Sequence, residues 1–261
     1  MGGFSFASVV LSYFLTAGGL LTGSILITKL HTTSEVVGLL CWAIGSFIGG
    51  FFAARASRGS TIIEPAIGAV LVVATLVISV MGGESAREMW HAGGSSVGKF
   101  VAEVTAALVI GAVAGAFVSE KAFGEATTSG APWIVYSALT SLGAMVMAAI
   151  VCVLLAVRGE SSLDKLATMV LVGTVAGAFL GGVAIGASAR MRVMGPAFLG
   201  GALGVVALTL LSLTQGGGGS GRGLHEDGAA AGVAIIAVIA GLVTMFGAGV
   251  GWAIWGKKNA A

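Results

Sequence analysis

The chain has 261 residues, of which 57% are hydrophobic and only 9% are charged, and its formal net charge is +2. So few polar side chains cannot cover a water-soluble globule, and we expect membrane lipids to surround much of the protein. Its 13 Lys and Arg are spread thinly along the sequence, which excludes a basic patch dense enough to bind nucleic acid.

Eight apolar stretches of the chain are long enough to cross a bilayer as helices. A hydrocarbon core about 30 Å thick needs roughly 20 helical residues, because each backbone amide must be bonded within its own segment. In chain order, the predicted spans are 5–29, 35–56, 62–82, 98–118, 132–157, 165–188, 194–214 and 229–255. The sequence therefore predicts an all-α, polytopic membrane protein whose short links form helical hairpins.

Two links between the predicted spans are longer than the others. Residues 82–96 hold a stretch of mixed charge, Met and Trp from Glu84 to His91, which fits either a short interfacial helix or a plain loop. The other begins with four glycines and a serine at 216–220, which is typical of a flexible linker. His225 follows beside two acids, where a solvated loop is a simpler interpretation than a metal site.

The second half of the sequence repeats the first. Residues 45–50 read GSFIGG and residues 177–182 read GAFLGG, and Arg58 and Arg190 follow them at the same distance. Further matches occur in the same order: Leu15-Thr16 and Gly19 with Leu139-Thr140 and Gly143, Pro65 with Pro196, and Gly111 and Gly115 with Gly247 and Gly251. Conserved order favours duplication over chance similarity. We expect two four-helix repeats, 1–125 and 126–261, with the same orientation because each has an even number of spans.

The distribution of positive charge gives a weak indication of orientation. Lysines and arginines are divided almost evenly between the two predicted sides, but Arg58 and the terminal Lys257-Lys258 stand directly at helix ends, where the positive-inside bias is strongest. We expect both termini in the cytoplasm and the protein in the cell (inner) membrane. Trp133 and Trp255, near span ends, suit an interfacial aromatic belt.

Small residues recur four apart in several spans, which places each pair on one helix face. The glycines selected on this pattern for close helix packing are Gly45, Gly49, Gly111, Gly115, Gly177, Gly181, Gly247 and Gly251. Helices in lipid gain little by burying apolar surface on each other, so close van der Waals contact must supply much of their association energy. These faces either pack within the chain or dock a second copy or another membrane subunit.

No ionisable residue lies in the middle of a predicted span, where pumps and ion-coupled carriers usually bind charge. Glu64 precedes Pro65, and both suit the first turn of a helix. Glu103 follows Lys99 by four residues, so the two can form an ion pair. Glu103 is also a candidate for lining a pathway.

Two pairs of polar residues are matched by the repeat. Arg58 and Arg190 either contact lipid headgroups or an anion at the membrane surface, or only set the topology. Thr16 and Thr140 either bond their own helix or a neighbouring helix, or line a pathway between the halves with Glu103.

The residues that catalysis or metal binding would need are dispersed. His31, His91 and His225 lie in separate links, and no zincin, nucleophile or nucleotide-binding motif is present. Cys41 and Cys152 stand alone within apolar spans, without metal-ligand spacing. We expect no catalytic activity and no cofactor or metal.

Two functional hypotheses follow. The first is a structural or accessory subunit that packs through its Gly/Ala-rich faces into a homo-oligomer or a larger membrane complex. The second is a small transporter or channel for a neutral or weakly polar solute, since transporters often arise by duplication. A cavity between the halves lined by Thr16, Thr140 and Glu103 would favour the second hypothesis, and a densely packed seam there would remove its main support.

Overall fold

The computed structural model describes residues 5–30, 34–56, 62–81, 84–123, 130–157, 163–189, 193–215 and 229–256. Within these ranges the chain is helical and contains no strand. The helices are α1 (Phe6–Leu30), α2 (Glu35–Ala56), α3 (Ile63–Met81), α4 (Glu84–Phe123), α5 (Gly130–Val157), α6 (Leu163–Ser188), α7 (Met194–Gln215) and α8 (Ala229–Gly251), followed by the π-helix η1 (Trp252–Gly256). The predicted all-α fold is confirmed.

Six of these helices are long and apolar enough to cross a membrane. The spans are Phe6–Leu30, Glu35–Ala56, Gly98–Ala122, Pro132–Val153, Thr168–Ser188 and Val233–Trp255. The third helix of each half contributes a shorter apolar stretch, Ile63–Ile78 in α3 and Met194–Leu210 in α7. The chain is therefore a membrane-embedded, polytopic protein.

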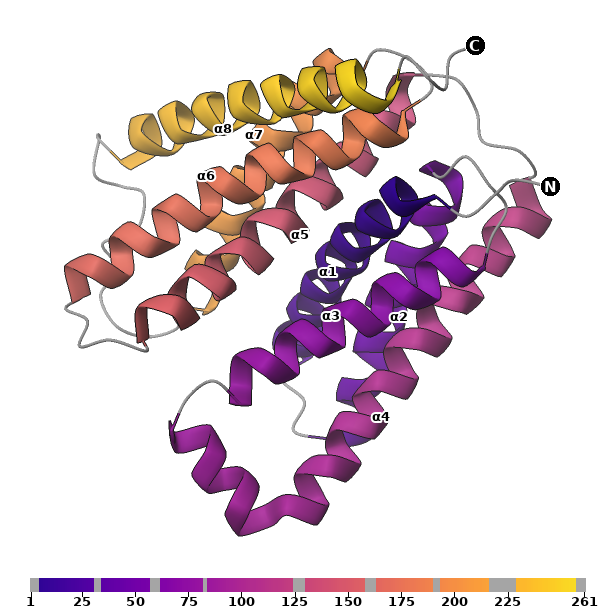
Figure 1. Ribbon diagram of the computed structural model, residues 1–261, viewed down its shortest axis with the longest axis vertical. Helices are drawn as coiled ribbons and strands as arrows, with labels where there is room; N and C mark the ends of the chain where they lie inside the picture. The colour runs from indigo at the N-terminus through magenta and orange to yellow at the C-terminus, as the bar shows by residue number, and fades with distance from the viewer. Residues whose placement is uncertain are drawn as a thin grey trace.

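The largest difference from the predicted spans is in α4, which is 40 residues long and begins at Glu84. The link that fitted either an interfacial helix or a loop is thus helical over 84–96. The amino-terminal part of α4 bends away from the rest of the helix (Figure 1). The glycine-rich link at 216–220 and His225 lie outside the described residues.

The helices form two groups of four that have the same pattern of neighbours (Figure 1). In the first group, α1 and α4 each pack against both α2 and α3, whereas α2 and α3 contact each other only slightly. In the second group, α5 and α8 each pack against both α6 and α7 in the same way. The order of the elements and their pairing therefore agree between the two halves.

Close contacts of glycines identify equivalent positions in the two halves. A side chain at Gly115 of α4 would meet the carbonyl of Phe47, and one at Gly247 of α8 would meet the carbonyl of Phe179. The two phenylalanines occupy the same place in the GSFIGG and GAFLGG segments. Gly115 is therefore equivalent to Gly247, and not to Gly251, with which the sequence comparison matched it.

Close contacts of glycines also identify equivalent positions in α1 and α5, the first helices of the two halves. Ser12 of α1 lies against Gly68 of α3, and Ser137 of α5 lies against Gly200 of α7. Ser12 is therefore equivalent to Ser137. Each residue of α1 thus corresponds to a residue of α5 one position later than the sequence comparison predicted.

This one-residue shift changes which residue of α5 is the equivalent of Thr16. Gly49 of α2 lies against Thr16, and Gly181 of α6 lies against Ser141. The structural equivalent of Thr16 is thus Ser141, the neighbour of Thr140.

The contact between α1 and α5 forms the seam between the halves. A side chain at Gly18 would meet the carbonyl of Leu139, and one at Gly143 would meet the carbonyl of Phe14. Because these contacts are equivalent, the halves meet about an approximate twofold axis. The backbones touch here, and the seam is densely packed.

An aromatic cluster continues the contact between the halves toward the start of α5. The ring of Tyr136 lies 5.4 Å from that of Phe52 and 5.5 Å from that of Trp133, measured between centroids. Trp133 is buried in this cluster. It is therefore a core residue, and its expected place in an interfacial belt is wrong.

Candidate functional site

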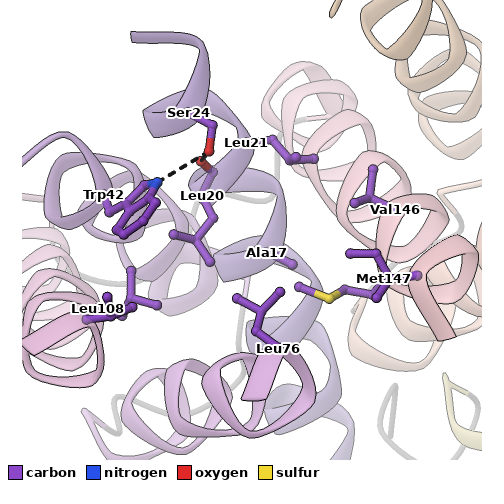
Figure 2. A pocket seen from close by; sticks show the side chains of 11 residues that line it. Ala17, Leu20, Leu21, Ser24, Trp42, Leu76, Leu108, Val146 and Met147 are labelled. Atoms are coloured by element: carbon purple, nitrogen blue, oxygen red, sulfur yellow. Dashed lines mark hydrogen bonds between the residues drawn. The ribbon is translucent and has the colours of Figure 1, made fainter. Parts of the chain in front are cut away.

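An apolar cavity of about 240 Å³ lies in the first half, beside the seam (Figure 2). All four helices of that half and α5 contribute to its wall, which consists of Ala17, Leu20, Leu21, Ser24, Trp42, Leu76, Val104, Leu108, Val146, Met147 and Ile150. Met147 and Val146 enter the wall from the second half (Figure 2). No lining side chain is ionisable, so the cavity offers nothing to neutralise a charged ligand.

One polar pair interrupts the apolar wall. The indole N–H of Trp42 donates to Ser24 Oγ at 3.3 Å, and the Ser24 hydroxyl donates to the carbonyl oxygen of Leu20 at 3.1 Å (Figure 2). Both donors are thus satisfied within the protein. A hydroxyl oxygen has two lone pairs, so Ser24 can accept one more hydrogen bond from a ligand.

The cavity is displaced from the middle of the spans that surround it toward the side of the carboxyl end of α1. Ala17 and Ser24 bracket it on α1, a helix that runs from Phe6 to Leu30. Val104 and Leu108 line it within the Gly98–Ala122 span of α4.

The second half contains a related cavity of about 380 Å³, which is open to the outside beside the exposed side chains of Val170, Leu171 and Ile236. Six lining residues of the first cavity have structural equivalents that line the second: Leu20 and Met145, Leu21 and Val146, Ser24 and Ala149, Trp42 and Thr174, Leu76 and Leu208, Val104 and Ile236. Only the first cavity has the bonded polar pair. In the second, the hydroxyls of Thr174 and Thr209 donate to carbonyls of their own helices at 2.8 and 3.0 Å.

Glu64 is a buried carboxylate with no measurable exposure. The backbone N–H of Ser5, directly before α1, donates to Glu64 Oε1 at 2.9 Å. The acid stands in the first turn of α3 as expected, and it also receives a backbone N–H at the amino end of another helix. An acid beside a proline in an apolar segment was the sequence signal for it, but its burial depends on α1.

The eight selected glycines all lie against neighbouring helices of the same chain. In each, an added side-chain carbon would come closer than ordinary contact to atoms of another helix. Gly45 faces Gly19 of α1, and Gly111 faces Ala43 of α2. These faces are therefore occupied from within the protein.

The remaining candidate residues are not brought together. Thr16 and Thr140 are buried, and the Thr140 hydroxyl donates to the Tyr136 carbonyl at 2.6 Å. Neither threonine lines either cavity. Glu103 lies 3.6 Å from Lys99 in the expected ion pair on a partly exposed face of α4. Arg58 and Arg190 lie outside the described residues.

Comparison with known proteins gives no relative. No family model, curated protein or solved structure matches this chain. Among the described residues, no three His, Cys, Asp or Glu side chains are close enough to hold a metal ion. The functional argument therefore rests on the cavities and on the polar groups near them.

Proposed function

We propose that this chain is a small, non-catalytic membrane transporter for a neutral, weakly polar solute, which binds in the cavity beside Trp42. The seam between the halves is densely packed and holds no cavity lined by Thr16, Thr140 and Glu103, so the support expected from the sequence is lost. The observation that carries the proposal is instead an apolar cavity beside the seam, walled by helices of both halves, with one polar pair. Ligand sites commonly combine an apolar wall with a few placed polar groups that orient the ligand. Here Ser24 is the group that would accept a hydrogen bond from the solute.

The size of the cavity limits the solute. An engineered apolar cavity of roughly 150 Å³ binds benzene, so 240 Å³ accommodates a molecule of several carbon atoms with one polar group. Charged solutes are disfavoured because the wall supplies no counter-charge.

The matched contacts of the two halves support duplication of a four-helix unit, at 1–125 and 126–261. Repeats with an even number of spans have the same orientation, as in transporters built from parallel repeats. We place both termini in the cytoplasm and the protein in the cell (inner) membrane, on the basis of the helix-end lysines and arginines.

The alternative is a structural or accessory subunit of a homo-oligomer or membrane complex. Its motive was the excess of Gly/Ala-rich faces together with the absence of charge in the middle of the predicted spans, and the eight selected glycines already face helices of this chain. A subunit role would therefore use the outer faces, where large aliphatic side chains such as Leu171 and Ile235 are exposed.

Quenching of Trp42 fluorescence tests binding in the cavity. A variant that keeps Trp42 and carries Phe at positions 90, 133, 252 and 255 is titrated in vesicles with tribromoethanol, a small molecule with one hydroxyl. We expect saturable quenching that is lost in Val104→Phe, which fills the cavity. Ile110→Phe, on the exposed face of the same helix, should keep it. Linear quenching that is equal in all three proteins would contradict binding at this site.

Swelling of proteoliposomes tests transport. Glycerol, propanediol and butanediol are compared, and at least one should enter faster than into empty vesicles, with the gain lost in Val104→Phe. If tribromoethanol binds but no solute enters faster, the transport proposal fails and a ligand-binding accessory role is favoured.

A further inference from the structure

The cavity of the second half opens toward the outside between α6 and α8, whereas the cavity of the first half does not. None of the described residues that line the first cavity is exposed. In the second cavity, Val170 and Leu171 of α6 are 43% and 57% exposed, and Ile236 of α8 is 47% exposed. These residues belong to the spans Thr168–Ser188 and Val233–Trp255. The mouth of the second cavity therefore lies among aliphatic side chains of membrane spans.

Branched side chains account for the room at this mouth. In the first half, the backbones of α2 and α4 approach each other where Gly111 lies against the carbonyl of Ala43. In the second half, Val243 stands at the place of Gly111 and Val175 at that of Ala43. Two valines prevent the backbone contact that a glycine allows, which leaves room between α6 and α8 on the side of their amino ends.

An aromatic pair closes the equivalent place in the first half. The rings of Trp42 of α2 and Phe100 of α4 meet edge to face, with 6.2 Å between their centroids. Phe100 lies one turn before Val104, which is part of the cavity wall. Thr174 and Gly232 stand at the places of Trp42 and Phe100 in the second half. The second cavity thus lacks the two rings that close the first.

The second cavity has room for a slender chain but not for a helix. One turn of an α-helix, about 10 Å across and about 5.4 Å high, fills roughly 420 Å³, which is more than the 380 Å³ of the cavity. The hydroxyls of Thr174 and Thr209 in the wall donate to carbonyls of their own helices. The rest of the wall is apolar, so dispersion contacts would supply most of the binding energy of an occupant.

We infer that an acyl chain of a membrane lipid occupies the second cavity and enters it from the leaflet at the amino ends of α6 and α8. Val170 and Ile236 lie near the amino ends of their spans, and Ala149 lies near the carboxyl end of its span, which places the cavity in that leaflet. An empty cavity would leave the wall atoms without contacts, and lipid is the molecule that surrounds the spans. The site is independent of the proposed function, which uses the first cavity.

Photo-crosslinking from lipid tests this site. The protein is reconstituted in phosphatidylcholine vesicles that contain phosphatidylcholine with a diazirine on one acyl chain, and mass spectrometry locates the adducts after illumination. We expect adducts at the buried wall residues Met145 and Val205, and also at Ile239 on the exposed face of α8. Leu20, the equivalent of Met145 in the first cavity, should carry none.

Three results would overturn the inference. The first is a set of adducts confined to exposed residues, and the second is an equal yield at Leu20 and Met145. The third is the loss of adducts from Ile239 as well, which would assign this face to a second copy of the chain.

Closing the second cavity with the rings of the first provides a sharper test. Thr174→Trp combined with Gly232→Phe should lower the yield at Met145, relative to that at Ile239, at least about tenfold, because overpacking a filled space is unfavourable by about that factor. Phe246→Trp adds a ring on the exposed face of α8 and should leave this ratio unchanged. An unchanged ratio in the double variant would overturn the inference. If the double variant does not fold, the comparison of the two cavities in the natural chain still decides.

The reverse exchange tests the role of the aromatic pair. Trp42→Thr combined with Phe100→Ala removes both rings from the first cavity, and we expect adducts to appear at Leu20. If Leu20 stays unlabelled while the exposed residues of the same protein are labelled, the aromatic pair is not what closes the first cavity.

Discussion

The two halves of this protein share their helix contacts but differ in their polar groups. Gly115 and Gly247 make the same close approach to the neighbouring helix, and so do Gly68 and Gly200. The hydrogen bond between Trp42 and Ser24 has no equivalent in the second cavity. Close packing of backbones thus preserves the framework, while a small number of side chains distinguishes the two cavities.

The differences cluster around α1 and its equivalent, α5. Ser24 and Trp42 of the first cavity are replaced by Ala149 and Thr174 in the second. Because Gly68 corresponds to Gly200, Pro196 stands in the place of Glu64 and not in that of Pro65, with which the sequence comparison matched it. The two halves can differ in these polar groups and keep the same helix contacts, because close packing of backbones at the glycines is present in both.

The largest effect should come from breaking the shared framework. Gly115→Ala and Gly247→Ala place a methyl group against a backbone carbonyl, and overpacking of this kind costs about 1–3 kcal/mol. Both should lower the thermal unfolding midpoint in detergent by similar amounts. Gly98→Ala and Gly195→Ala are matched controls, because open space surrounds both positions. A midpoint that falls equally at Gly98 would refute the role given to close approach.

A smaller effect should follow from making the first cavity resemble the second. Ser24→Ala removes the hydroxyl that Trp42 bonds and that a solute would use, and one hydrogen bond is worth about 0.5–1.5 kcal/mol. We expect the dissociation constant of tribromoethanol, measured by Trp42 quenching, to rise about two- to tenfold. Bromobenzene, which has no hydroxyl, should bind as before. Equal weakening of both probes would mean that Ser24 only shapes the cavity.

The smallest effect should come from Glu103, which lies away from both cavities. The pair with Lys99 is exposed, and such pairs contribute about 0.5 kcal/mol or less. Glu103→Gln should leave the unfolding midpoint and any protein-dependent solute entry nearly unchanged. A large loss of solute entry would instead restore Glu103 to the pathway predicted from the sequence.

The membrane fold follows from local features of the sequence. Apolar length sets each span, so the predicted and observed helices agree closely except at the start of α4, where residues 84–97 are too polar to count as a span. The matches between the two halves were also visible in the sequence. Their register was uncertain because glycines recur every four residues, so a shift of one turn, as between Gly247 and Gly251, still aligns glycine with glycine.

The candidate site depended on tertiary structure. The cavity is a space that five helices leave between them, and no single segment encodes it. Ser24 and Trp42 are partners only because α1 and α2 bring them together. Thr140 and Glu103 were chosen by chemistry alone, and the fold separates them from both cavities.

The most direct test of the central claim is a structure of the protein in lipid with tribromoethanol, with bromine located by anomalous scattering. The account predicts a bromine site enclosed between Trp42 and Met147, within reach of Ser24, and a weaker site or none in the second half. Bromine found only on lipid-facing surfaces, with the space beside Trp42 empty, would contradict it.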